Sequence, residues 1–237
     1  GVDPAYTRTP LATDLISLYA VGGVSFGAHE SQSRLWENHV GRSRAFWSNH
    51  MGVIKAAYPG LLDDVTDEEF YRAVNRSEPS FIRVEADELT YDFHIMLRAE
   101  LEAKMVDGSL EVAELPEAWN AAMKNYLGVD VPNDAQGVLQ DVHWSSGQIG
   151  TFCNYTIGNI MAAQLFDTAT SENPGIQTAL DGANYAPLRD WLTDSVAQHG
   201  RRYTRDELLV NATGRALDPE PYIAHLTTKF TDIYDLS

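Results

Sequence analysis

The 237 residues are enough to bury a hydrophobic core, and a hydrophobic content of 44% is typical of a globular chain and argues against disorder. Acidic residues outnumber basic ones by 34 to 17, and the resulting net charge of −17 argues against nucleic acid or an anionic membrane as a partner. The single cysteine, Cys153, excludes an internal disulfide and is typical of a reducing cytoplasm. With no basic neighbour to activate it, we expect Cys153 to be a buried, inert thiol.

Helical periodicity dominates the sequence, and it predicts a series of helices along the chain. Apolar residues recur every three to four positions from about Ala28 to Tyr58, which predicts one long helix ended by a Pro-Gly pair. Thr66 and Glu69 form a capping box for a short helix. A second long helix is predicted from about residue 81 to residue 105, and Gly108 follows its end. Further helices are predicted over residues 117–127, 155–170, 187–199, 205–212 and 219–234.

The stretch from Gly128 to Asn154 lacks this period and is rich in Gly, Asn, Asp and Ser. Loops of this length in a compact domain are usually functional or disordered, and the aromatic residues at its end argue against disorder. No internal repeat or low-complexity linker occurs, and no apolar run reaches the ~18 residues of a membrane span. The sequence therefore predicts a single all-α domain over residues 1–237, with an irregular region around 128–154.

The pair His29-Glu30 places a carboxylate where the first long helix begins. A zinc peptidase needs three protein ligands and an open position for water, and a helical carboxylate can supply one of those ligands. The alternative is structural, because Glu30 could form an i,i+4 surface ion pair with Arg34. Spacing alone favours the ion pair.

Polar residues recur every three to four positions along the second predicted helix, at Arg83, Asp87, His94 and Arg98. They could form a solvated face with i,i+4 pairs such as Arg83–Asp87. They could equally line a cleft in which Arg83 or Arg98 binds a carboxylate through two parallel hydrogen bonds. The pattern does not decide between these alternatives.

His143 lies beside Trp144 within the irregular region, in a glycine-containing loop. Such a histidine can donate a hydrogen bond to a developing oxyanion or position a substrate, although a structural contact with Asp141 is equally compatible. Tyr155 follows, and its phenol could donate to a tetrahedral intermediate or belong to the core.

Three segments together resemble the carboxypeptidase Taq family of zinc metallocarboxypeptidases. They are His29-Glu-Ser-Gln-Ser-Arg-Leu-Trp-Glu-Asn38, Ile82-Arg-Val-Glu-Ala-Asp-Glu88 and Gly137-Val-Leu-Gln-Asp-Val-His-Trp144, and the similarity covers nearly the whole chain. The resemblance implies a largely helical, cytoplasmic and often dimeric enzyme that removes C-terminal residues from peptides. It also implies roles for four residues: zinc ligand for Glu30, binding of the substrate's C-terminal carboxylate for Arg83, action near the scissile carbonyl for His143, and an active-site tyrosine for Tyr155.

The chain departs from the family pattern in two ways. It contains no His-Glu-x-x-His sequence, which carries the other two zinc ligands and the general base of the family. The apolar stretch 14–22 looks like an insertion just before the helix of Glu30. We therefore expect the C-terminal, substrate-side portion of a zinc-dependent metallocarboxypeptidase, inactive and weakly zinc-binding by itself, and a homodimer.

Two alternatives stay open at this point. The chain could be a non-enzymatic helical dimerisation or scaffold module that retains relic motifs. A metal site could also be rebuilt between two chains from His29, Glu30 or His94, although nothing in their spacing requires it.

Overall fold

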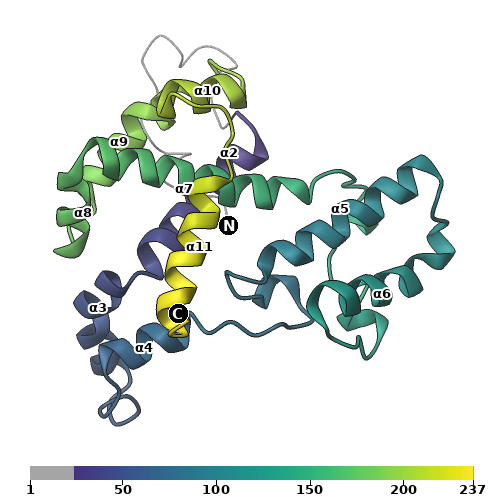
Figure 1. The fold of residues 1–237 in the computed structure, drawn as a ribbon, viewed down its shortest axis with the longest axis horizontal. Helices are drawn as coiled ribbons and strands as arrows, with labels where there is room; N and C mark the ends of the chain where they lie inside the picture. Colours follow the sequence, from purple (N-terminus) through teal and green to yellow (C-terminus); the bar gives the residue numbers. More distant parts are fainter. Residues whose placement is uncertain (1–23, 237) are drawn as a thin grey trace. The chain divides into compact units, whose positions relative to one another are not determined.

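A computed structural model describes residues 24–236, and this part of the chain folds into helices, turns and loops without a strand (Figure 1). The all-α prediction is confirmed. The predicted insertion at 14–22 lies outside the described residues. None of the helices within residues 24–236 has the length and hydropathy that a membrane span requires.

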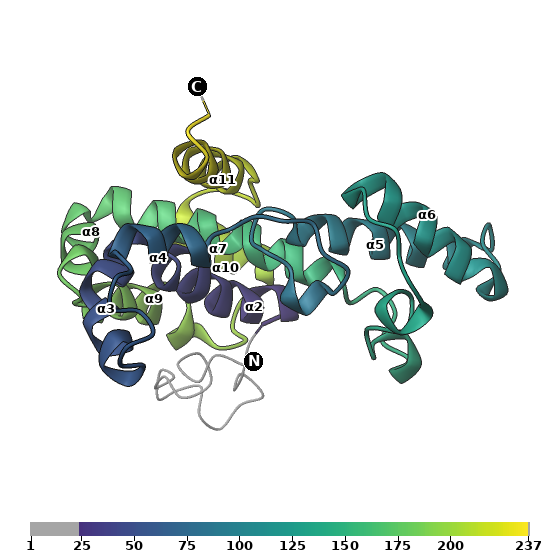
Figure 2. The ribbon, with the colours of Figure 1, turned by 90° about the horizontal axis from the view of Figure 1, so that it is seen from below.

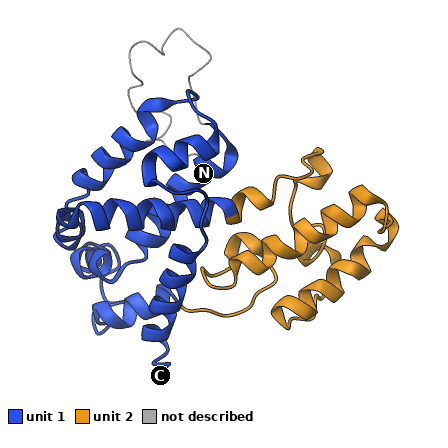
Figure 3. Cartoon of the chain, turned by 45° about the horizontal axis from the view of Figure 1, so that its top comes forward, with its two compact units in different colours: residues 1–75, 157–237 blue, residues 76–156 orange. Residues whose placement is uncertain are grey.

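The chain divides into two compact units, shown in different colours in Figure 3. Unit 1 comprises Gly1–Asn75 and Ile157–Ser237, and unit 2 comprises Arg76–Thr156. Unit 2 is therefore one continuous segment inserted into the sequence of unit 1. The expectation of a single domain over residues 1–237 stays a prediction.

The described part of unit 1 begins with α-helix, continues as π-helix and then starts a new α-helix. Helix α2 (Phe26–Arg34) starts at Ser25, whose hydroxyl accepts a hydrogen bond from the Ala28 N–H at 3.1 Å, and it continues into the π-helical segment η2 (Leu35–Gly41). Helix α3 (Arg44–Ala57) starts anew, because the Ser43 hydroxyl caps the Phe46 N–H at 3.1 Å. The prediction of one helix over 28–58 is therefore wrong at its centre, where a local cap ends one helix and starts the next.

The rest of unit 1 follows the predicted helices closely. The capping box at Thr66 is confirmed at the start of α4 (Asp67–Val74). The later helices are α7 (Cys153–Glu172), which belongs to unit 1 from Ile157 on, α9 (Ala186–Ser195), the 3-10 turn η7 (Ala197–His199), α10 (Arg205–Thr213) and α11 (Glu220–Ile233). Helix α8 (Pro174–Asp181) was not predicted: Pro174 and Gly175 resemble a turn signal, but Pro174 occupies the first helical position, where its missing N–H costs nothing.

The core of unit 1 joins segments that are far apart in the sequence. Ala28 of α2 and Leu35 of η2 are fully buried in the same cluster as Leu165 of α7, Leu188 of α9 and Leu208 of α10. This packing fixes α2, the helix of Glu30, against the centre of unit 1.

Unit 2 is built on a helical hairpin. Helix α5 (Tyr91–Asp107) ends at Gly108, whose φ of 78° requires the left-handed conformation that glycine adopts readily. The 3-10 turn η4 (Val112–Glu114) leads into α6 (Leu115–Leu127), which packs against α5 (Figure 2). Leu97, Trp119 and Met123 are buried between the two helices.

Helix α5 starts ten residues later than predicted from the periodicity. Residues 82–90 form only the 3-10 turn η3 (Arg83–Glu85), and the Asp87 carboxylate accepts the N–H groups of Leu89 and Thr90 at 2.9 Å each. Asp87 therefore holds the chain in a turn and delays the helix. It makes no ion pair with Arg83, whose guanidinium pairs with Asp141 instead, so of the two alternatives the i,i+4 pair of Arg83 and Asp87 is not formed.

The irregular region predicted for 128–154 contains only the short 3-10 turns η5 (Asp134–Gln136) and η6 (Trp144–Ser146) before α7 begins. Cys153 opens α7 and is exposed, so the prediction of a buried thiol is wrong. The neighbouring Phe152 takes the buried place, and the Cys153 thiol lies 3.4 Å from the carbonyl oxygen of Gly150.

Candidate active site

Unit 2 contains a buried ion-pair cluster, in which the carboxylate of Asp141 joins two arginines. The Nη2 atom of Arg83 lies 2.6 Å from Oδ1 of Asp141, and Nη2 of Arg98 lies 2.7 Å from Oδ2. We call Arg83, Arg98 and Asp141 the arginine cluster. With two guanidinium groups and one carboxylate, it carries one excess positive charge.

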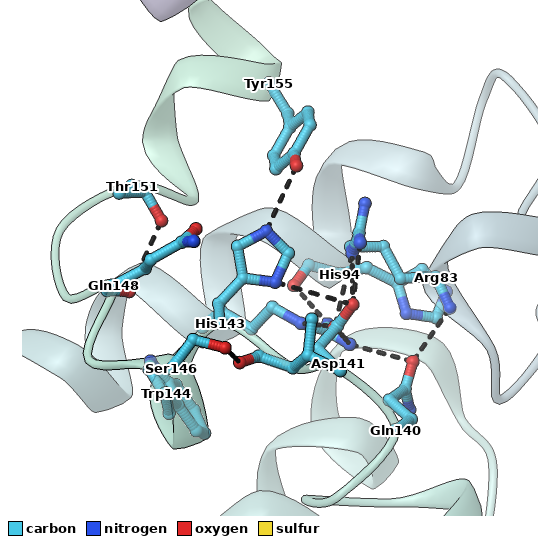
Figure 4. Close-up of polar contacts among 12 residues, drawn as sticks. Arg83, His94, Gln140, Asp141, His143, Trp144, Ser146, Gln148, Thr151 and Tyr155 are labelled. Carbon is cyan, nitrogen blue, oxygen red and sulfur yellow. Dashed lines mark hydrogen bonds and ion pairs between the residues drawn. The ribbon is translucent and has the colours of Figure 1, made fainter. Parts of the chain in front are cut away.

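Gln140, next to Asp141, connects the cluster to the chain around it (Figure 4). Its Oε1 accepts hydrogen bonds from the backbone N–H of Arg83 and from Nη2 of Arg98, both at 2.9 Å. Its Nε2 donates to the carbonyl of Phe81 at 2.8 Å. The loop containing Gln140 is thereby fixed both to the turn of Arg83 and to helix α5.

The two arginines of the cluster differ in accessibility. Arg98 has no exposed surface, and its guanidinium lies 4.4 Å above the Trp119 ring. The side chain of Arg83 keeps 7% of its surface exposed, and its guanidinium lies 4.8 Å above the Tyr155 ring. Only Arg83 of the two is therefore open to a ligand.

The charges of the cluster shift one another's ionisation. Burial acts to raise the pKa of Asp141, but hydrogen bonds and positive charge from Arg83 and Arg98 outweigh it and hold this pKa below its ordinary value. Burial lowers the pKa of Arg98 to about 10 against the favourable charge of Asp141. At neutral pH all three groups are therefore charged.

His143 and Tyr155 form a second polar contact beside the cluster. Nε2 of His143 lies 3.1 Å from the Tyr155 hydroxyl, and Figure 4 shows the two side chains pointing toward each other. Nδ1 of His143 lies 3.9 Å from Asp141, too far for a hydrogen bond, and makes none to the part of the chain that is described. Burial, the largest influence, lowers the pKa of His143, which favours the neutral imidazole.

Helix α5 contacts the loop of His143 at a second point, in addition to the contact of Arg98 with Gln140 and Asp141. The indole N–H of Trp144 donates to the Glu102 carboxylate at 2.7 Å, and Glu102 is buried one turn beyond Arg98. His94, one turn before Arg98, is also fully buried. The structure thus brings together four residues that the sequence identified as candidates: Arg83, Arg98, His143 and Tyr155. The contacts through which Gln140, Asp141 and Glu102 connect them were not predicted.

Glu30 belongs to unit 1, where it pairs with Arg34 across 3.1 Å. The predicted i,i+4 pair is therefore present, with 23% of the Glu30 side chain exposed. Helix α7 approaches Glu30 closely at Gly158: a Cβ atom on this glycine would lie 2.8 Å from the Cβ of Glu30. The close contact of the two helices fixes the backbone position of Glu30.

The described residues do not by themselves fit a metal ion. Within residues 24–236, no group of three or more His, Cys, Asp or Glu side chains is arranged to bind one. Glu30 offers a single carboxylate, whose Oε1 atom accepts a hydrogen bond from Nε of Arg34. A zinc site needs further ligands.

Comparison with known proteins gives a consistent result. Residues 6–230 match a family described as carboxypeptidase Taq (M32) metallopeptidase. The chain is 40% identical to Carboxypeptidase 1 of Bacillus subtilis over 90% of its own length and 42% of that protein. It is 42% identical to Thermostable carboxypeptidase 1 of Thermus thermophilus over 89% of its own length and 41% of that protein.

The solved structures agree with these relatives. The M32 carboxypeptidase from Deinococcus radiodurans R1 matches with a TM-score of 0.94 and 46% identity, over 98% of this chain and 47% of that one. The chain thus spans less than half the length of the proteins it matches, and the match covers their C-terminal portion.

Proposed function

The chain belongs to the carboxypeptidase Taq (M32) family of metallopeptidases, and we propose that it forms the substrate-binding part of a zinc-dependent carboxypeptidase that releases C-terminal amino acids from peptides. The observation that carries this proposal is the excess positive charge of the arginine cluster, with Arg83 at its accessible edge. A buried cationic site of this kind favours an anionic ligand, and a peptide's free C-terminus is one.

The hydrogen bonds of Arg83 leave room for such a ligand. Its Nε and Nη2 donate to Asp141, and its Nη1 donates to the Tyr91 hydroxyl at 3.0 Å. Each terminal nitrogen of a guanidinium carries two N–H groups, so one remains on Nη1 and one on Nη2 beside the contacts made by described residues. Two such donors suit the two oxygens of a carboxylate.

His143 and Tyr155 are the proposed catalytic residues. The Tyr155 ring packs against the Arg83 guanidinium and its hydroxyl contacts His143, so a peptide whose carboxylate binds Arg83 would carry its last peptide bond close to this pair. A hydrogen bond from a phenol or from a neutral imidazole stabilises negative charge that develops on a carbonyl oxygen, and the contact between His143 and Tyr155 leaves one of these two donors available. Arg98 contributes to substrate binding through the cluster.

Glu30 is the proposed metal ligand in unit 1. The Nε–H group of Arg34 donates a hydrogen bond to the Glu30 carboxylate and orients it. Metal-binding side chains are commonly oriented by such hydrogen bonds from neighbouring residues. When bound, zinc would polarise the carbonyl of the scissile peptide bond and activate a water molecule. The remaining ligands would come from outside residues 24–236. The family resemblance further implies a cytoplasmic homodimer, and both features are part of the proposal.

The test is binding of matched peptides to the 237-residue chain by calorimetry. We expect tri-alanine with a free carboxylate to bind at least about tenfold more tightly than tri-alanine amide, since hydrogen bonds to a charged group contribute about 1.5–3 kcal/mol. Arg83→Met should abolish this preference. Arg76→Met, an exposed arginine of the same unit, is the matched control and should keep it. Equal binding of the two peptides by the unaltered chain would contradict the proposal.

A further inference from the structure

We propose that Arg98 is a positioning residue, which never contacts the substrate but orients Arg83 through Asp141 and Gln140. The inference rests on the proposed function and adds to it. Arg98 is completely buried between the rings of Trp119 and Phe152, with its guanidinium 4.4 Å and 5.4 Å from their centroids. A ligand that reaches the exposed edge of Arg83 has no access to it.

Every nitrogen of the Arg98 guanidinium is already engaged. Nε donates to Oδ2 of Asp141 at 2.8 Å, Nη1 to the carbonyl of His94 at 2.6 Å, and Nη2 to Oε1 of Gln140 at 2.9 Å. The bond to His94 ties the guanidinium to the helix that bears it. Arg98 is therefore fixed at one end by α5 and presents its other two nitrogens to the loop.

The two loop residues that Arg98 contacts, Asp141 and Gln140, also contact Arg83. Asp141 receives the Arg83 side chain on Oδ1, and Gln140 receives the Arg83 backbone N–H on Oε1. Arg98 contacts Oδ2 of the first and Oε1 of the second. Both the backbone and the guanidinium of Arg83 are thus aligned through contacts that end on Arg98.

This arrangement needs the planar fork of arginine and not only its charge. The three acceptors of Arg98 lie in three directions around the guanidinium, whereas a lysine offers one nitrogen on a flexible stem. Arg98→Lys keeps the positive charge but cannot hold the three acceptors in the same geometry. The substitution should therefore disturb the alignment of Arg83 without removing the excess charge of the cluster.

The test compares tri-alanine and tri-alanine amide with the unaltered chain, Arg98→Lys, and Arg76→Lys as the exposed control. In Arg98→Lys we expect the preference for the free carboxylate to fall about tenfold, the loss of roughly one well-aligned charged hydrogen bond. Binding of the amide should stay within about twofold, because a purely structural defect would weaken both peptides alike. Arg76→Lys should leave both values unchanged.

The outcomes separate the two proposals. A preference in the unaltered chain that persists in Arg98→Lys overturns the role of Arg98 and leaves the proposed function intact. Absence of any preference in the unaltered chain overturns both. If Arg98→Lys does not fold, Gln140→Met is the second variant, because it removes one of the two connections from Arg98 to Arg83. It must lower the preference for the free carboxylate. An unchanged preference in Gln140→Met also overturns the inference.

Discussion

His94 shows how strongly single side chains of this site depend on their surroundings. It is completely buried, and neither ring nitrogen makes a hydrogen bond within the described residues. Burial first, and then the positive charges of Arg98 and Arg83, lower the pKa of His94 from 6.5 to about 4. The folded protein therefore keeps this imidazole neutral at pH values where an unfolded chain would protonate it.

This difference predicts a loss of stability in mild acid. Between pH 6.5 and about 4 the unfolded chain binds a proton at His94 that the folded chain does not, so the free energy of unfolding must fall as the pH falls through this range. From pH 7 to pH 5 the loss should be about 2 kcal/mol, and above pH 7 this residue should contribute almost none.

Urea denaturation at pH 7 and pH 5 measures this effect. His94→Leu removes the titrating group and should reduce the difference between the two pH values by about 2 kcal/mol. His199→Leu, at a partly exposed position of unit 1, should leave it nearly unchanged. The interpretation fails if His94→Leu loses as much stability on acidification as the unaltered chain.

At the scale of elements, the contact between α2 and α7 sets where Glu30 lies. Gly158 is buried within α7, and an added Cβ would lie 2.8 Å and 2.9 Å from the Cβ and Cγ atoms of Glu30. Contacts this short force the helices apart. The glycine therefore stabilises the close helix pair, although glycine is generally unfavourable inside a helix.

Gly158→Ala should consequently destabilise the protein by about 1–3 kcal/mol, the usual cost of overpacking, despite the gain of up to about 1 kcal/mol in helix propensity. Gly52→Ala provides the matched control, because Gly52 lies inside α3 with nothing within 4 Å of an added Cβ. That control should be neutral or slightly stabilising. Thermal denaturation of the two variants compares them directly, and equal melting temperatures would contradict the close-contact argument.

The limits of sequence-based prediction are visible in the same elements. Capping boxes and a C-terminal glycine act over three or four residues, so the start of α4, the start of α10 and the end of α5 were predictable. The apolar period continues across Ser43 and Asp87, whose side chains nevertheless end or delay a helix. Asp141 contacts Arg83 and Arg98 from 58 and 43 residues away, and no local pattern identifies such pairs.

At the scale of the whole molecule, the residues that we propose for substrate binding and the residue that we propose as a metal ligand belong to different units. The arginine cluster and the His143–Tyr155 pair both lie in unit 2, and their contacts are made by residues of that unit. Glu30 lies in unit 1, and no described residues complete a metal site around it. Peptide binding and peptide hydrolysis should therefore be separable in this chain.

We accordingly expect the purified 237-residue chain to bind a free peptide carboxylate but to show no carboxypeptidase turnover of a blocked dipeptide and only weak affinity for zinc. One carboxylate cannot replace the three protein ligands of a catalytic zinc site, and the sequence contains no His-Glu-x-x-His. Zinc calorimetry and amino-acid release, each with and without a chelator, measure the two properties. Turnover that a chelator suppresses would show that this chain assembles a complete metal site, and Glu30→Gln would then establish whether Glu30 belongs to it.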